Sequence, residues 1–136
     1  MRALYVLDCC ALLAYLGDEP GADTIEALLL RAQMRNVAAH AINIYELYYQ
    51  LLRFAGQEQA DRVVHELAEL GIHIERNISN LLMHSAAHFK TTYKLSVADS
   101  IALAYAKLNQ AHLVTSDHHE MDAVDAAGEV KFCWFR

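Results

Sequence analysis

Short apolar runs alternate with segments of helical periodicity along the chain, and this alternation limits the fold more than any other feature. Five runs have the length and composition of strands: residues 4–7, 36–40, 72–77, 112–115 and 130–135. Between them, apolar spacing predicts helices over 9–16, 22–34, 42–55, 57–70, 78–93 and 97–109, with a short helical turn after Asp117. Short apolar strands are buried on both faces, and strands that alternate with helices pair in parallel. The sequence therefore predicts a three-layer α/β/α sandwich around a short, mainly parallel sheet of four to five strands.

Length and charge narrow the class of protein further. We expect one domain over residues 1–136, because 55% of the residues are hydrophobic and no repeat or linker divides the chain. A net charge of −6 argues against a broad basic surface, so any polyanion must be bound locally. No apolar run approaches the roughly 20 residues of a membrane-spanning helix. Together with an N-terminus that enters a strand directly, this predicts a cytoplasmic protein without a signal peptide.

The cysteines indicate a reducing environment. Cys9, Cys10 and Cys133 are odd in number, and none forms a C-x-x-C pair. We interpret them as small apolar core residues.

Four carboxylates stand inside or at the edge of apolar segments: Asp8 in LYVLDCCALLAYL, Glu46 in INIYELYYQLL, Asp99 in LSVADSIALAYA and Asp117 in HLVTSDHHEMD. Open α/β sheets place their sites beyond the carboxyl ends of the strands, where Asp8 and Asp117 lie. Glu46 follows about one turn into a helix, and Asp99 is in the first turn of another. If the four converge, their charges repel and require a cation, and Mg2+ or Mn2+ prefers such oxygen ligands. The pattern indicates a metal site for phosphoryl chemistry.

Each acid also has a purely structural explanation. Asp8 suits the N-cap of the helix that begins at Cys9. Ser96 with Asp99 fits an S-x-x-D capping box, and Asp117 with Glu120 fits a D-x-x-E version. Four independent caps at one sheet edge are harder to explain than one site, and a capping carboxylate can also bind metal.

Glu46 has a different alternative explanation. Together with Asn43, Gln50 and Arg53 it recurs at spacings of three and four residues, as in an ordinary polar stripe. Taken alone, Glu46 is explained by such a stripe as well as by a site.

Aromatic and histidine side chains offer weaker candidates. Tyr45, Tyr48 and Tyr49 could stack on bases, but their mostly apolar helix favours packing or a protein interface. His84 and His88 share a helix face but lack the glutamate of H-E-x-x-H, which disfavours zinc.

The quoted segments, in their order along the chain, resemble the PIN-domain family, specifically VapC-like toxins of bacterial and archaeal toxin–antitoxin pairs. The specific parts are D-x-x-A-L-L-A-Y-L followed by EPGA, and L-S-x-A-D followed by a strand that ends in T-x-D. The closing KFCWFR is similar to the short C-terminal strand of the family. The likeness spans essentially the whole chain.

This resemblance implies a PIN-like sandwich and a Mg2+- or Mn2+-dependent endoribonuclease that hydrolyses phosphodiesters with a metal-activated water. Asp8, Glu46, Asp99 and Asp117 match the acidic quartet that would hold the metal and carry catalysis. Thr115 matches the threonine of T-x-D and would support the last acid or a water. Cys9 and Cys10 stand where the family usually has a small residue and a Ser or Thr.

Substrate and partners follow from the same resemblance. We expect Arg53, Lys90 and Lys94 to contact RNA, since few cations stand near the acids in sequence. We also expect a cognate antitoxin to lay a helix on an apolar groove, between helices 22–34 and 42–70. A homodimer or a toxin–antitoxin hetero-oligomer would result.

Two alternatives remain at this point. The protein could be a DNA- or structure-specific nuclease of the same fold, which strand preference would separate from a ribonuclease. It could also be a catalytically silent PIN-like interaction module, which would bind no metal.

Overall fold

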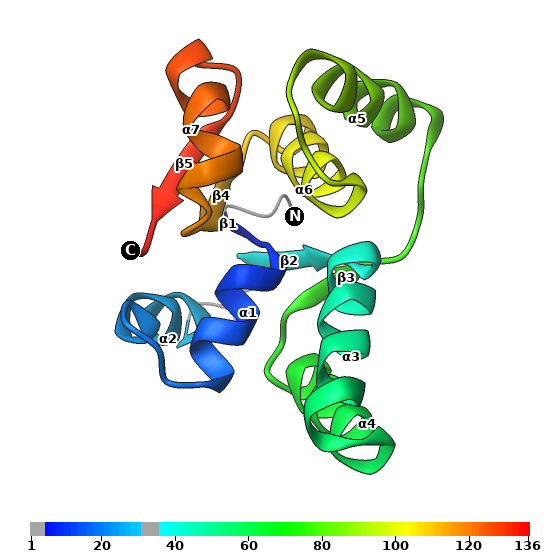
Figure 1. Cartoon of the computed structure of the whole chain (residues 1–136), viewed down its shortest axis with the longest axis vertical. Helices are drawn as coiled ribbons and strands as arrows, with labels where there is room; N and C mark the ends of the chain where they lie inside the picture. Colours follow the sequence, from blue (N-terminus) through cyan, green and yellow to red (C-terminus); the bar gives the residue numbers. More distant parts are fainter. Residues whose placement is uncertain (1–4, 31–35) are drawn as a thin grey trace.

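A computed structural model describes residues 5–30 and 36–136, which form a five-stranded sheet between two layers of helices (Figure 1). The strands are β1 Tyr5–Leu7, β2 Val37–His40, β3 His73–Glu75, β4 His112–Thr115 and β5 Lys131–Trp134. The helices are α1 Cys9–Leu16, α2 Ala22–Leu30, α3 Ala41–Ala55, α4 Gln57–Glu69, α5 Asn80–Thr92, α6 Val97–Leu108 and α7 His118–Ala127. All strand pairs are parallel, as the alternation of strands and helices predicted.

Successive strand residues point to opposite faces, and both faces are buried. Val6 and Leu113 pack with residues of α5, α6 and α7 in one core. Leu7 and Val114, their neighbours along the strands, pack with residues of α1 to α4 in the other. This is why the strands are apolar without alternation, and it confirms the three-layer sandwich.

The strand order β3-β2-β1-β4-β5 fixes where a site can form. The chain moves outward from β1 to β2 and β3, and then returns to the other side of β1 with β4. The loops that leave β1 and β4 therefore diverge to opposite faces and open a crevice at the carboxyl ends of these strands. Asp8 follows β1 and Asp117 follows β4, so both lie at this crevice.

The elements differ from the sequence prediction mainly in their lengths. The helical turn expected after Asp117 is a ten-residue helix, α7, which buries Met121 and Val124 and ends at Gly128 in the left-handed conformation. The strand expected over 72–77 has only three paired residues. Residues 31–34 of the helix predicted over 22–34 lie outside the described residues.

None of the helices in the described part of the chain has the length and apolar character needed to cross a bilayer.

Candidate active site

Asp8 connects the first strand to the first helix and is 1% exposed. Its Oδ1 accepts the Ala11 N–H at 2.9 Å, which confirms the predicted N-cap. Burial raises the pKa of Asp8 to about 7; hydrogen bonds from Thr115 and Ala11 oppose this, and the charges of Asp117 and Glu46 add to it. Oδ2 is buried and has no hydrogen-bond partner among the described residues. One oxygen of this carboxyl is thus held at the start of α1, and the other is buried with its hydrogen-bonding capacity unused among the described residues.

Asp117 is positioned by the T-x-D turn at the end of β4. Its N–H donates to Oγ1 of the fully buried Thr115 at 3.1 Å, and its Oδ1 accepts the Glu120 N–H at 3.2 Å as N-cap of α7. Thr115 therefore supports both aspartates. It lowers the pKa of Asp8 and fixes the backbone of Asp117.

Asp99 is the third residue of α6, and its N–H donates to the Ser96 Oγ at 3.1 Å. The second bond of this capping box comes from elsewhere, because the Ser96 N–H donates to Oε2 of Glu120 at 3.2 Å. Glu120 likewise does not complete the predicted box at α7. Its carboxylate instead joins two helices that are separate in the sequence.

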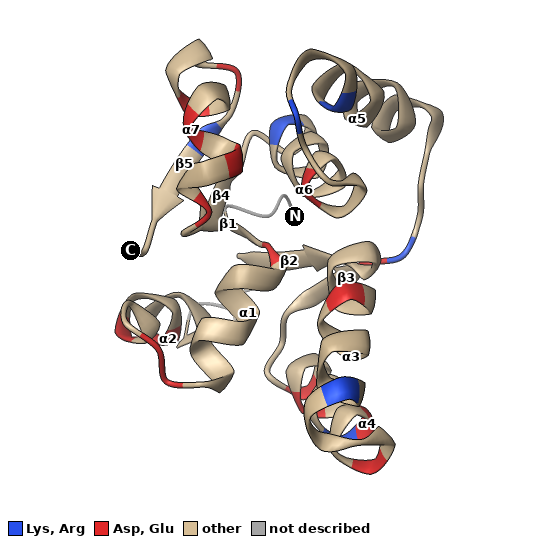
Figure 2. Cartoon of the chain, in the orientation of Figure 1, with Lys and Arg blue, Asp and Glu red and all other residues tan. Residues whose placement is uncertain are grey.

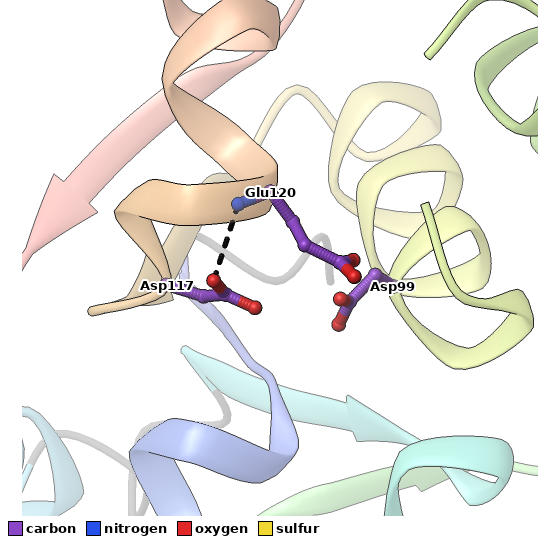
Figure 3. Close-up of side chains that lie close together, drawn as sticks. All are labelled: Asp99, Asp117 and Glu120. Atoms are coloured by element: carbon purple, nitrogen blue, oxygen red, sulfur yellow. Dashed lines mark hydrogen bonds between the residues drawn. The ribbon is translucent and has the colours of Figure 1, made fainter. Parts of the chain in front are cut away.

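Glu120 also contacts Asp99 directly. Burial raises the pKa of Asp99 well above its ordinary value, and a hydrogen bond with Glu120 and the charges of Asp8, Glu120 and Asp117 reinforce this. The same hydrogen bond is the main cause that lowers the pKa of Glu120. One oxygen from each of Asp99, Asp117 and Glu120 lies within 4.8 Å of the others (Figure 3). We call these three residues the acidic trio.

Glu46 approaches the site from the second turn of α3. Burial raises its pKa, a hydrogen bond with Cys9 opposes the rise, and the charges of Glu120 and Asp117 add to it. The polar-stripe explanation is wrong at its start, because Asn43 is fully buried and its side-chain amide has no hydrogen bond within the described residues. Gln50 on the same face donates to the Cys9 Sγ at 3.8 Å. This face packs toward α1, while Arg53 beyond it is exposed.

The structure brings all four expected acids into one electrostatic cluster and adds a fifth. The charges of Asp117 and Glu46 raise the pKa of Asp8. The charges of Asp8, Asp117 and Glu120 raise the pKa of Asp99. Figure 2 shows acidic positions between β1 and α1, in α3, in α6 and in α7. The sequence pattern indicates Glu120 only as a capping residue. The D-x-x-E spacing was the one signal that pointed to Glu120, but this spacing does not show where its carboxylate lies.

The expected cations differ in their surroundings. Lys90 and Lys94 line a hollow that also includes Ser96 and Glu120, and the Lys90 Nζ donates to the Leu95 carbonyl at 2.7 Å. The Arg53 guanidinium lies over the Tyr49 ring, 5.3 Å from its centroid. The two lysines thus share a hollow with Glu120, a member of the acidic trio.

The cysteines agree with their interpretation as packing residues. All three are free, Cys9 is buried, and Cys10 and Cys133 are partly buried. Burial raises the pKa of the Cys10 thiol to about 12, so it stays protonated at neutral pH.

A family model described as the PIN domain matches residues 5–127. The chain belongs to the PIN-domain family. Solved structures confirm the fold of this PIN domain. It resembles DNA-bound VapBC from Salmonella typhimurium, with a TM-score of 0.75 and 12% identity over 100% of both chains. It also resembles VapBC2 from Rickettsia felis bound to a promoter DNA fragment, with a TM-score of 0.73 and 17% identity over 96% of this chain and 97% of that one.

A third similar structure is VapC20 from Mycobacterium tuberculosis, a toxin that cleaves the sarcin–ricin loop. Its TM-score is 0.62, with 15% identity over 90% of this PIN domain and 94% of the VapC20 chain. A search of curated protein sequences finds no match. The acids of this PIN domain therefore stand on a fold shared with VapBC proteins.

Proposed function

We propose that this PIN-domain protein is a divalent-metal-dependent endoribonuclease and the toxin of a toxin–antitoxin pair. The observation that carries the proposal is the convergence of five carboxylates at the carboxyl ends of β1 and β4. Folding places their charges together with few neutralising cations nearby, an arrangement that a hard cation stabilises. Similarity to a sarcin–ricin-loop-cleaving toxin supports RNA as the substrate.

The residues fit Mg2+ or Mn2+ by their donor chemistry. The five acids offer carboxylate oxygens, and Mg2+ and Mn2+ prefer these over softer ligands. Asp8 Oδ2 is buried and has no partner within residues 5–30 and 36–136, and the oxygens of the acidic trio lie close enough to share one ion. Asp8, Glu46, Asp99 and Asp117 would hold the metal, together with Glu120. The bound cation would polarise the scissile phosphate and lower the pKa of an attacking water.

The protein itself holds the carboxylates in position. The Ala11 and Glu120 N–H groups hold one oxygen each of Asp8 and Asp117, which leaves the second oxygens fixed in place. Lys90 and Lys94 would bind the phosphates that flank the cleaved bond, and Arg53 would contact the strand further along α3. Because burial raises the pKa of Asp8 to about 7, cation binding there competes with a proton and should weaken below neutral pH.

An antitoxin is the partner we propose, and the surface offers a groove for it. The groove lies between α2 and α4, beside the end of α1. Tyr15, Val63, Leu67 and Leu70 are among its apolar lining, and Asp18, Glu26, Glu66 and Glu69 supply four negative charges. An amphipathic helix with basic flanks complements this surface. Similar structures are VapBC complexes, which supports such a partner. Homodimerisation and a cytoplasmic location stay predictions.

The first experiment compares purified wild type with Asp99→Asn and with Asp23→Asn, a control at an exposed acid in α2. Each is incubated with tRNA, rRNA fragments and single-stranded DNA in Mg2+, Mn2+ or EDTA. We expect metal-dependent RNA products with 5′-phosphates from wild type and Asp23→Asn, and at least a roughly 100-fold loss for Asp99→Asn.

Equal cleavage by wild type and Asp99→Asn would contradict the proposal, because any nuclease present would then be a contaminant. Metal-dependent cleavage confined to DNA would instead support the DNA-specific alternative. If no substrate is cut, calorimetric titration with Mn2+ decides between the alternatives. Mn2+ binding by Asp23→Asn but not by Asp99→Asn would support the metal site. No Mn2+ binding by either variant would support a silent module.

A further inference from the structure

An apolar hollow of about 310 Å³ opens beside the acidic cluster. Its walls come from two segments, the first half of α3 and the start of α6. The lining residues are Ile42, Tyr45, Glu46, Tyr49, Ser96, Val97 and Ala98. Each segment carries one acid of the site, since Glu46 is in the wall and Asp99 directly follows Ala98. The hollow therefore adjoins the place where the scissile phosphate would lie.

The hollow presents apolar groups that the described part of the chain leaves uncovered. Tyr45 and Val97 are each 63% exposed. The Tyr45 and Tyr49 rings meet edge to face, with centroids 5.4 Å apart and planes at 69°. Packing therefore does not explain Tyr45, although the sequence favoured packing or a protein interface for this helix. By contrast, Tyr48 is fixed by a 2.6 Å hydrogen bond to Asp61.

The lysine-lined hollow next to this one indicates the path that a bound strand would follow. Ser96 lines both hollows, so the lysine-lined hollow and the aromatic one meet at the N-terminus of α6. Glu120 borders the first and Glu46 borders the second. A nucleic-acid strand that passes the acids would thus have cations on one side for its phosphates and an exposed ring on the other for a base.

We propose that the hollow binds an unpaired nucleobase next to the scissile phosphate, with Tyr45 as the stacking residue. This inference rests on the proposed nuclease function and adds a specificity-determining subsite to it. A flat aromatic ligand covers the Tyr45 ring and the Val97 methyl groups, while its polar edge stays in water. Stacking tolerates any base, so the subsite selects single-stranded over paired RNA more than it selects sequence.

The test combines protein variants with modified RNA. The variants are Tyr45→Ala, Tyr45→Phe, which keeps the ring, and Phe54→Ala. Phe54 is a matched control because it lies on the same helix, is 80% exposed and does not line the hollow. The substrate is a short single-stranded RNA that wild type cleaves, together with versions that carry one abasic nucleotide at each position around the cleaved bond.

We expect removal of one base near the cleaved bond to raise the wild-type KM about 10- to 100-fold, the size of one lost stacking contact. Tyr45→Ala should raise the KM for intact RNA by a similar factor, and the same abasic site should then have little further effect. Tyr45→Phe and Phe54→Ala should keep the full abasic penalty. Thermal unfolding of each variant controls for loss of fold.

The inference would be overturned if Tyr45→Ala and Phe54→Ala had equal KM values and the abasic site still raised the KM of Tyr45→Ala in full. The exposed Tyr45 ring would then be explained by a contact with a protein. Metal-dependent cleavage by wild type would still stand in that case. If wild type cleaves no RNA, that result contradicts the proposed nuclease function and not the subsite. Fluorescence anisotropy with labelled RNA in EDTA then tests the subsite alone, and equal affinities of Tyr45→Ala and Phe54→Ala would overturn it.

Discussion

Asp8→Asn should stabilise the metal-free protein at alkaline pH while it removes a metal ligand. Asp8 is 1% exposed and lies among other carboxylates, so the folded state keeps it charged only at a cost. Asparagine cannot ionise, yet its side-chain oxygen can still accept the Ala11 N–H at the N-cap. The substitution therefore removes the charge and preserves the local hydrogen bond.

The expected size follows from the pKa. Folding raises the pKa of Asp8 from 3.8 to about 7. Between these values the unfolded chain has lost the proton and the folded chain has kept it, so stability falls as pH rises, and it levels off above pH 7. At about 1.4 kcal/mol per pH unit, the full cost comes to about 4–5 kcal/mol. Relaxation around the charge and the buried amide of the new asparagine reduce the net gain to about 1–3 kcal/mol at pH 8.

Urea unfolding followed by circular dichroism in EDTA measures this gain. Wild type, Asp8→Asn and the exposed-acid control Asp23→Asn are compared at pH 5 and pH 8. We expect wild type and Asp23→Asn to lose stability between these pH values and Asp8→Asn to lose less. Addition of Mn2+ at pH 8 should then stabilise wild type but not Asp8→Asn. An Asp8→Asn protein that is less stable than wild type at pH 8, with the same pH dependence, would refute the reasoning.

Two further predictions concern binding surfaces. Lys94→Ala should raise the KM for RNA several-fold. It should also lower the slope of log affinity against log salt concentration by about 0.7–1, because one phosphate contact is lost. An unchanged slope would place Lys94 outside the RNA path. Glu66→Lys reverses one charge of the α2–α4 groove and should weaken inhibition by a co-expressed antitoxin about 10-fold or more while RNA cleavage by the free protein continues. Inhibition that resists this reversal would place the antitoxin elsewhere.

The tertiary structure added information where a side chain depends on another element. Asn43 fits a polar stripe by spacing, but the packing of α3 buries it. Tyr45 fits a packed helix by composition, yet its face of α3 borders a hollow. The α7 segment HHEMDAVDAA has only two large apolar residues, so its pattern indicated only a turn. Its two buried residues, Met121 and Val124, stabilise a full helix because the sheet lies beneath them.

The sequence by itself determined the five strands, the helices α1 to α6, the α/β/α class and the caps at Asp8, Ser96 and Asp117. These features depend on strand burial and on hydrogen bonds between residues three positions apart, which a local pattern records. Only the tertiary structure decided that Glu120 joins the cluster. Its carboxylate reaches Ser96, 24 residues away, because the strand order brings the start of α7 beside the start of α6. The sequence pattern shows which strands exist but not their order in the sheet, and that order sets the distances between the acids.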